Sequence, residues 1–196
     1  DMVWGEKLTE YIVQQVLANR QLELEILERD TEMLKKVKTP FPRISYSECV
    51  ENLRDAGFDF EWGNDFGSPE ETFLAERFDR PVIVHRFPTK IKAFYMKRDP
   101  DNEKVVLGMD FLAPEGYGEI IGGSEREADL NVLLDRIKKE NLPRAEFEWY
   151  LDLRKYGTVP HAGFGMGIER MVCWICKLPH VRESIPYPRM LGKLRP

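Results

Sequence analysis

The stretch PHAGFGMGIER, Pro160 to Arg170, decides the fold prediction because it joins a glycine-rich strand to the start of an apolar helix. Side chains of a strand alternate between its two faces, so Gly163, Gly165 and Gly167 would expose one bare strip of backbone. A flat ligand could lie on this strip, or a neighbouring helix could pack closely against it. The glycines alone leave both interpretations open.

Arg170 favours the ligand. A cation in the first turn of a helix opposes the positive end of the helix dipole, at a cost of about 0.3–1 kcal/mol that Glu169 offsets in part. An anion bound at the helix start would explain the arginine, because backbone N–H groups and a guanidinium can both donate to phosphate oxygens there. The glycine strip and Arg170 together indicate a nucleotide, with its base over the glycines and a phosphate beside the arginine.

Helices are predicted from apolar periodicity and from capping residues. Residues 6–37 are expected to be helical, with a break near Asn19. Ser45 and Glu48 predict a capping box at the start of a helix that ends at Gly57.

Four more helices follow along the chain. Ser68 is expected to cap the first of them, with Pro69 in its first turn and Glu71 completing a second capping box. Two amphipathic helices are predicted over 130–137 and 145–156. The last helix should bury a stripe formed by Ile168, Met171, Val172, Ile175 and Leu178.

Strands are predicted where short β-branched or aromatic runs are separated by turn residues. These runs are VIVHRF (82–87), IKAFYM (91–96), KVVLGMDFLA (104–113) and GEIIGG (118–123), which would form a sheet of about four strands, followed by VPHAGFG (159–165). Because no regular βαβ repeat is present, the fold class is α+β with a largely antiparallel sheet. This excludes a Rossmann dinucleotide site, whose fingerprint GxGxxG also differs from the GxGxG found here.

Composition is that of one globular domain, with 196 residues, 42% of them hydrophobic and 32% charged. The net charge of −5 provides no basic surface for non-specific nucleic-acid binding, so such a partner would be bound locally or by another part of a longer protein. We expect a protein that is neither secreted nor bound to a membrane.

Cysteine usage indicates structural thiols. Cys173 and Cys176 are spaced CxxC within an apolar helix, and Cys49 stands alone. A zinc or redox site would need a second pair of ligands or a turn at that point, and the sequence shows neither. We therefore expect free thiols and a cytoplasmic location.

The stretch MDFLAPEGYGEIIGGSERE carries a second group of polar residues. Asp110 and Glu119 lie at the ends of two adjacent predicted strands, where they could hold Mg²⁺ beside a triphosphate or be solvated turn acids. Arg126 could bind a carboxylate or carboxamide through two hydrogen bonds, or form a salt bridge with Asp129 or Glu127. No pairing of nucleophile and base is visible, so catalysis would depend on positioning and charge stabilisation.

These residues together resemble a known family. GFGMGIERMVCWI resembles motif 3 of the class II aminoacyl-tRNA synthetases. IKAFYM, LAPEGYGEIIGGSERE, WYLDLRKYGTVPHAGFG and VRESIPYPR are similar, in order and spacing, to the asparaginyl branch of that family, and to its bacterial members above all. The resemblance covers essentially the whole chain.

The resemblance implies a class II catalytic core, an antiparallel six-stranded sheet flanked by helices. It also implies a ligase that binds ATP with Mg²⁺, activates asparagine to the adenylate and transfers it to tRNA(Asn). Arg170 matches the arginine that contacts the γ-phosphate, and the strip from Gly163 through Gly165 to Gly167 matches the surface near adenine.

Other positions match the metal and amino-acid sites of the family. Glu119 and Asp110 match carboxylates linked to the metal, and Glu119 is thereby a catalytic candidate with Arg170. Arg126, with Gly123 three residues before it, matches the position that binds the amino-acid side chain. Gly122, where aspartyl enzymes often carry serine, and Lys92, near which bacterial aspartyl enzymes carry histidines, both favour the asparaginyl branch.

Three parts of the family pattern would precede Asp1: the anticodon-binding OB domain, the dimer-forming motif 1, and motif 2 with its α-phosphate arginine. The resemblance thus implies that residues 1–196 are the C-terminal portion of an incomplete catalytic domain. The longer protein is expected to be a homodimer, and the isolated chain inactive or weak.

Two other functions compete with the ligase. A synthetase-like asparagine synthetase would amidate aspartyl-adenylate without tRNA. A non-catalytic synthetase fragment would serve as an interaction module.

Overall fold

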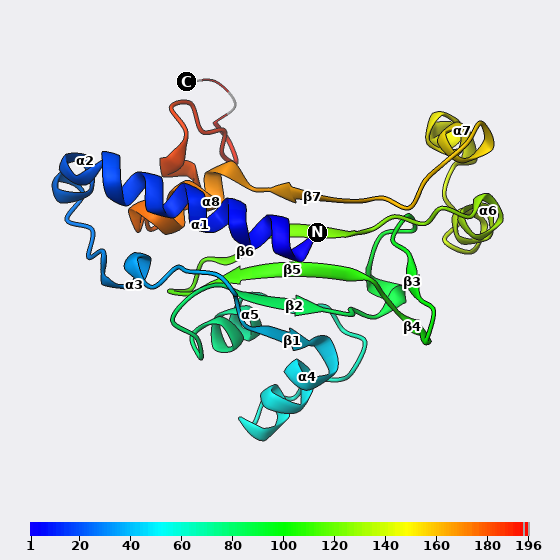
Figure 1. The fold of residues 1–196 in the computed structure, drawn as a ribbon, viewed down its shortest axis with the longest axis horizontal. Helices are drawn as coiled ribbons and strands as arrows, with labels where there is room; N and C mark the ends of the chain where they lie inside the picture. Colours follow the sequence, from blue (N-terminus) through cyan, green and yellow to red (C-terminus); the bar gives the residue numbers. More distant parts are fainter. Residues whose placement is uncertain (194, 196) are drawn as a thin grey trace.

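The computed structural model describes residues 1–193 and 195. Its centre is a five-stranded sheet in the order β1 (Arg43–Ser45), β2 (Val82–His85), β5 (Gly108–Ala113), β6 (Gly118–Glu125) and β7 (Ala162–Met166) (Figure 1). Neighbouring strands are antiparallel except β1 and β2, which are parallel. A separate ribbon pairs β3 (Arg98–Asp99) with β4 (Asn102–Val106). The predicted α+β class with a largely antiparallel sheet is confirmed.

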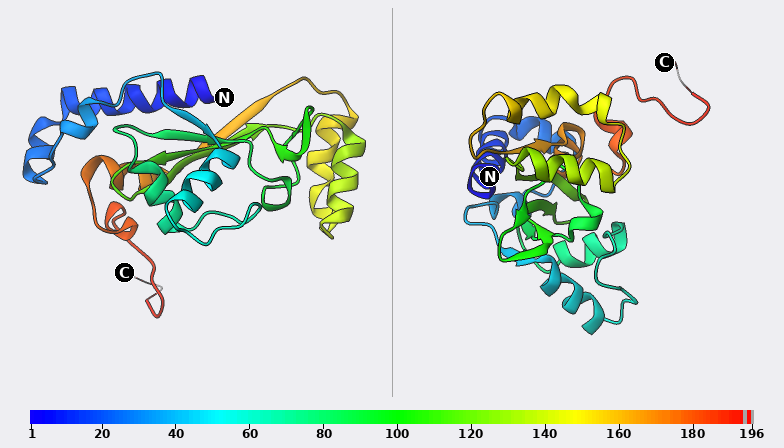
Figure 2. Two further views of the ribbon diagram at one scale, coloured as in Figure 1. Left: turned by 90° about the horizontal axis from the view of Figure 1, so that it is seen from below. Right: turned by 90° about the vertical axis from the view of Figure 1, so that its right-hand side faces the viewer.

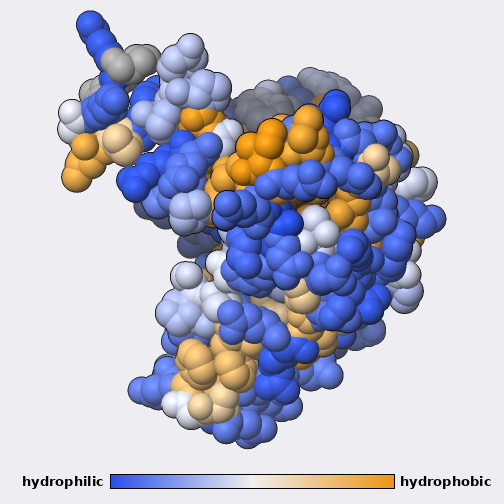
Figure 3. Space-filling model, turned by 90° about the vertical axis from the view of Figure 1, so that its left-hand side faces the viewer, coloured by the Kyte–Doolittle hydropathy of each residue, from blue (hydrophilic) through white to orange (hydrophobic). Residues whose placement is uncertain are grey.

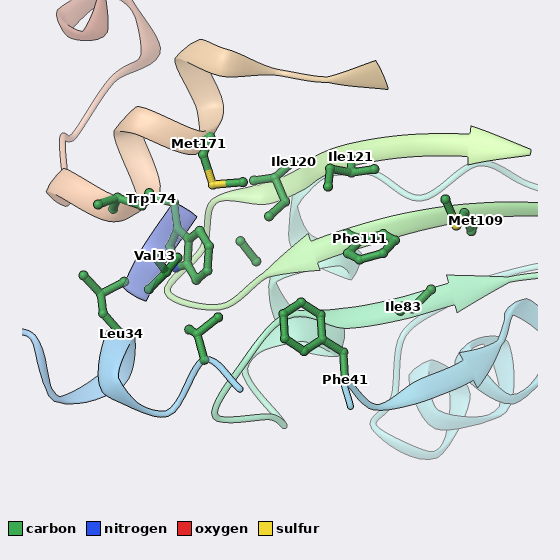
Figure 4. Packing of buried hydrophobic residues seen from close by; sticks show 13 residues of the cluster. Val13, Leu34, Phe41, Ile83, Met109, Phe111, Ile120, Ile121, Met171 and Trp174 are labelled. Atoms are coloured by element: carbon green, nitrogen blue, oxygen red, sulfur yellow. The ribbon is translucent and has the colours of Figure 1, made fainter. Parts of the chain in front are cut away.

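Helices cover both faces of the sheet. One face packs against α1 (Met2–Asn19), α3 (Glu32–Lys35) and α8 (Ile168–Cys176), and α2 (Gln21–Ile26) continues from α1. Figure 4 shows the core between them, where Phe111, Ile121, Met171 and Trp174 converge with the other labelled side chains. The other face packs against α4 (Tyr46–Asp55) and α5 (Ser68–Ala75).

A third helical layer closes one end of the sheet. There α6 (Leu130–Lys139) and α7 (Glu148–Lys155) lie beyond the strands, at the end opposite α2 and α8 (Figure 2). Three short 3-10 helices, η1 (Thr89–Ile91), η2 (Arg144–Phe147) and η3 (Val181–Ser184), complete the elements described. No helix within residues 1–193 and 195 is both long and apolar enough to span a bilayer.

Local signals predicted several helix ends correctly. The first helix ends at Asn19, as expected, and α2 starts at Gln21. The helix predicted to continue to residue 37 is wrong in part, because α2 ends at Ile26 and the next helix covers only Glu32–Lys35. The Ser45 capping box is also confirmed, since Ser45 Oγ accepts from the Glu48 N–H at 3.3 Å and Glu48 Oε2 accepts from the Ser45 N–H at 2.8 Å.

The second predicted capping box was wrong by one residue. Gly67, not Ser68, precedes the first turn of α5, and Glu70 Oε2 accepts from the Gly67 N–H at 2.9 Å. Glu70 stands three residues after Gly67, which is the spacing that lets its carboxylate reach that N–H. Glu71 is therefore free to turn inward, where its carboxylate accepts from the Glu119 N–H at 3.2 Å.

The strand predictions also need correction. IKAFYM is not a strand: it contains the end of η1 followed by turns. Its Phe94 ring packs against Phe147, with the two ring centroids 4.9 Å apart. KVVLGMDFLA divides into β4 and β5, and the short strands β1 and β3 were missed. The final helix buries Met171 and Ile175 as expected, but Ile168 is 69% exposed and Leu178 lies beyond the helix end.

An apolar groove of about 460 Å³ lies between α1, α2 and α8. Its lining includes Ile12, Val16, Leu27, Ile168 and Val172. Figure 3 shows hydrophobic side chains gathered on the side of the molecule that carries α2 and α8. The groove contains none of the predicted site residues.

The three cysteines are free thiols, as expected. Burial raises the pKa of Cys49 to about 12 and also raises the pKa of Cys176. Thiols held in the protonated form are poor nucleophiles, which agrees with a structural role.

Candidate functional site

The site lies on the face of the sheet opposite the α1 and α8 core. Asp110 of β5 pairs with Gly122 of β6, which in turn pairs with Gly165 of β7. Partners directly opposite in neighbouring strands project to the same face, so these three positions form one row. A cavity of about 530 Å³ opens over the row, lined by Lys92, Tyr95, Met96, Asp110, Glu119, Gly122, Gly123, Arg126, Phe164 and Gly165.

The glycines of β7 differ in what faces them. A methyl group added at Gly165 would meet no atom within 4 Å, so its backbone is bare. At Gly163 the same methyl group would lie 3.5 Å from Arg126 Nη2, which covers this part of the strip. Gly167 precedes α8, with the Arg170 side chain beside it. The open part of the predicted strip is therefore centred on Gly165.

Gly123 is a packing glycine. A methyl group there would lie 2.6 Å from the Phe164 Cβ and 2.9 Å from the Gly163 carbonyl oxygen. Only a residue without a side chain lets β6 approach β7 this closely. The Gly123 backbone lines the cavity, but its lack of a side chain is explained by strand packing.

This contrast gives a matched prediction. Gly165→Ala should leave the melting temperature of the intact protein within about 2 °C of the wild type and weaken ATP binding at least about tenfold, because the methyl group occupies the face that a base would cover. Gly123→Ala should lower the free energy of unfolding by about 1–3 kcal/mol, and with it the melting temperature, because the strands must move apart. Thermal melting and ATP titration of both variants test this. Equal destabilisation by the two variants would contradict it.

The two predicted metal carboxylates converge over Gly122. A methyl group at Gly122 would collide with Glu119 Oε1 and lie 3.4 Å from Asp110 Oδ1. Asp110 pairs with Lys92, whose Nζ lies 2.5 Å from Asp110 Oδ2. Within the described residues, no group of three or more His, Cys, Asp or Glu side chains is arranged to hold a metal ion. Two carboxylates fit Mg²⁺ when nucleotide phosphates and water supply the remaining ligands.

Sequence patterns missed Glu71. Its carboxylate accepts from the Glu119 N–H, and burial, reinforced by the Glu119 charge, raises the pKa of Glu71. The contact between Glu71 and Glu119 was missed because the sequence pattern assigned the Glu71 carboxylate to a capping box with Ser68.

Asp110 makes stability depend on pH. Burial raises its pKa from 3.8 to about 6, against the opposing effect of Lys92 and with a further increase from Glu119. Because the folded state binds the proton more tightly than the unfolded chain, this contribution is complete below about pH 4 and is lost as the pH rises through 6. The loss is about 2–3 kcal/mol.

Asp110→Asn should remove this dependence. In urea unfolding with EDTA, the free energy of unfolding of the variant relative to the wild type should rise by about 2–3 kcal/mol between pH 4 and pH 7. Loss of the Lys92 ion pair adds an offset between the two curves, so the test is the change of their difference with pH. A difference that is constant with pH would show that Asp110 does not titrate in this range.

The Arg126 guanidinium is fixed by the Tyr95 ring and by hydrogen bonds, one of them to the Gly163 carbonyl. The guanidinium lies 4.7 Å from the centroid of the Tyr95 ring, its Nη1 donates to Ser124 Oγ at 2.9 Å, and its Nη2 donates to the Gly163 carbonyl at 3.2 Å. The alternative salt bridges are not formed: Asp129 caps α6, and Glu127 accepts from the Asp129 N–H. Tyr95 was missed because it lies in the segment predicted as a strand.

Arg170 lies at the far end of β6, outside the cavity lining. Its Nη1 donates to the Glu119 carbonyl at 3.1 Å, so Arg170 and Glu119 are linked through the backbone. The Arg170 side chain is exposed and also borders a second hollow with Tyr117 and His180. Asp110, Glu119, Gly123, Arg126 and Gly165 thus line one cavity, whereas Gly163, Gly167 and Arg170 lie outside its lining.

The sequence and the fold of this chain are similar to those of known proteins. The sequence model of the family described as "tRNA synthetases class II (D, K and N)" matches residues 2–191. The chain belongs to that family. The fold expected from the resemblance, an incomplete class II synthetase core, is confirmed, although the described residues form five strands of the sheet rather than six.

Similar proteins resemble this class II synthetase chain along its whole length. It is 58% identical to an asparagine–tRNA ligase of Desulforamulus reducens, over all of this chain and 46% of that protein. The asparaginyl-tRNA synthetase of Pyrococcus horikoshii superposes with a TM-score of 0.96 at 51% identity, over all of this chain and 46% of that one. An aspartyl-tRNA synthetase of Entamoeba histolytica reaches 0.87 at 27% identity, over 98% of this chain and 40% of that one. The chain spans less than half the length of the curated relatives it matches.

Proposed function

We propose that the chain is part of an asparagine–tRNA ligase, which uses ATP to join asparagine to tRNA(Asn). The observation that carries the proposal is the row Asp110, Gly122 and Gly165, which lines one cavity with Arg126 in a chain 58% identical to an asparagine–tRNA ligase. We infer that residues 1–196 are a C-terminal portion of the catalytic domain of a longer, homodimeric, cytoplasmic protein. The OB domain, motif 1 and motif 2 would belong to its remaining length.

In this proposal ATP lies along β7. Its adenine ring covers the open backbone at Gly165, which a side chain would obstruct. Arg170, in the first turn of α8, donates to the γ-phosphate. The α8 N-terminus adds its positive dipole to this contact.

Asparagine lies against Arg126. The guanidinium offers a planar pair of donors to the carboxamide oxygen, and the Tyr95 ring keeps that plane oriented. Ser124 Oγ and the Gly163 carbonyl accept hydrogen bonds from the same guanidinium. A group held by this many contacts loses little conformational entropy when asparagine binds.

Asp110 and Glu119 would hold Mg²⁺, which when bound neutralises charge on the phosphates. In the first reaction a carboxylate oxygen of asparagine attacks the α-phosphorus, and the bond to pyrophosphate breaks. In the second, a hydroxyl group of tRNA attacks the asparaginyl carbonyl and AMP leaves. The residues described here bind, orient and stabilise charge, which is how such transfers are commonly accelerated.

ATP/pyrophosphate exchange in the intact protein tests the proposal. Exchange should depend on asparagine and should not occur with aspartate. Exchange with aspartate alone would overturn the assigned amino acid. Formation of free asparagine from aspartate and ammonia without tRNA would instead indicate the asparagine synthetase, and absence of any exchange would indicate a non-catalytic module.

A further inference from the structure

Lys92 occupies a position that the proposed reaction does not explain. It follows η1, and its ammonium group lies 2.5 Å from Asp110 Oδ2 and 4.0 Å from the centroid of the Phe87 ring. Only 15% of its side chain and 10% of the Asp110 side chain are exposed. The ammonium group is therefore placed on one of the oxygens that would hold a divalent cation.

The backbone that carries Lys92 is held from behind by a buried arginine. Arg136 of α6, whose side chain is 3% exposed, donates through Nη2 to the carbonyls of Lys92 at 3.1 Å and Thr89 at 3.2 Å. A fixed backbone with a flexible four-carbon side chain lets the ammonium group move while its attachment stays in place. Lys92 is thus tethered beside the carboxylates.

Charge in the cavity explains why a cation is needed there. Asp110 and Glu119 converge over Gly122. Glu71 lies outside the cavity lining and accepts from the Glu119 N–H. Among the ion pairs of the described residues, Lys92 is the cation paired with Asp110, and Glu119 has no such pair. Like charges held close together repel strongly in a poorly solvated site, so a resident cation stabilises the nucleotide-free state.

We propose that Lys92 is a tethered counter-ion that a divalent cation must displace from Asp110, and that it lowers the affinity of the nucleotide-free site for divalent cations. This inference rests on the proposed function for the identity of the metal site. Its consequence is that the metal is bound mainly together with ATP, whose phosphates supply the ligands and charge needed to displace Lys92.

The test is titration of the intact, nucleotide-free protein with Mn²⁺ at pH 8, with free Mn²⁺ followed by electron paramagnetic resonance. Lys92→Met should tighten Mn²⁺ binding about tenfold, within the usual range for coupling between two sites. Lys92→Arg keeps the charge and should bind like the wild type. Lys90→Met, on the exposed side of η1, is the matched control and should also be unchanged.

Two further variants keep the test decisive. Lys92→Gln retains a hydrogen-bond donor without the charge, so it should reproduce the tighter binding if Lys92→Met does not fold. Adding Asp110→Asn to Lys92→Met should abolish the gain, because the released oxygen is then lost. Unchanged or weaker Mn²⁺ binding in folded Lys92→Met and Lys92→Gln would overturn the proposal.

This titration contains neither asparagine nor tRNA, so it is independent of the exchange assay. Asparagine-dependent exchange without a shift in Mn²⁺ affinity would reject the counter-ion alone. A shift without exchange would support the counter-ion while rejecting the ligase.

Discussion

Arg170→Ala is expected to weaken ATP binding by the intact protein about 10- to 100-fold, because a hydrogen bond to a charged group contributes about 1.5–3 kcal/mol. The fold should be unaffected. Arg170 is exposed, and its hydrogen bond to the Glu119 carbonyl is a surface contact. Its removal also relieves an unfavourable interaction with the helix dipole of about 0.3–1 kcal/mol.

Equilibrium dialysis with labelled ATP and thermal melting measure the two effects separately. Arg20→Ala is the matched control, because Arg20 is an exposed arginine at the junction of α1 and α2 with one long ion pair of 3.9 Å to Glu23. ATP affinity should be unchanged in this control. Unchanged affinity in Arg170→Ala would remove Arg170 from the nucleotide site.

Arg126→Lys is expected to raise the KM for asparagine about 100-fold and to change ATP affinity less than about twofold, since hydrogen bonds to a charged group contribute about 1.5–3 kcal/mol. Lysine keeps the charge but cannot reproduce the planar pair of donors. It also loses the stacking on Tyr95 and the two contacts to Ser124 and Gly163.

Exchange kinetics at varied asparagine and a separate ATP titration distinguish these effects. Arg144→Lys, in a surface pair with Glu148, controls for the general effect of replacing arginine. Parallel loss of asparagine use and ATP binding in Arg126→Lys would mean that Arg126 supports the structure of the sheet rather than the amino acid.

Predictions from the sequence succeeded where the physical cause is local. The break after Asn19 and the box of Ser45 and Glu48 depend on residues within one helical turn of each other. The second box failed because Ser68 and Glu71 have the same spacing as Gly67 and Glu70, and the carboxylate that caps is decided by what the other one contacts. The alternation of glycines correctly predicted a strand that leads into α8.

Predictions failed where the cause is a distant neighbour. IKAFYM has the composition of a strand, but Phe94 packs on Phe147 of η2 and Tyr150 of α7. Its Lys92 carbonyl accepts a hydrogen bond from Arg136, 44 positions along the chain. Ile168 has the spacing of a buried residue and is exposed beside the apolar groove.

The sequence by itself determined the α+β class, several helix ends, the family and the candidate residues Arg170, Arg126, Asp110 and Glu119. Periodicity, capping and motif spacing are properties of neighbouring residues, so they can be read without a fold. Tertiary structure alone decided the register that places Asp110, Gly122 and Gly165 in one row, and it brought Glu71, Lys92 and Tyr95 to them. Those contacts join segments far apart in the chain, and their energies depend on burial and on charges that only the folded sheet brings together.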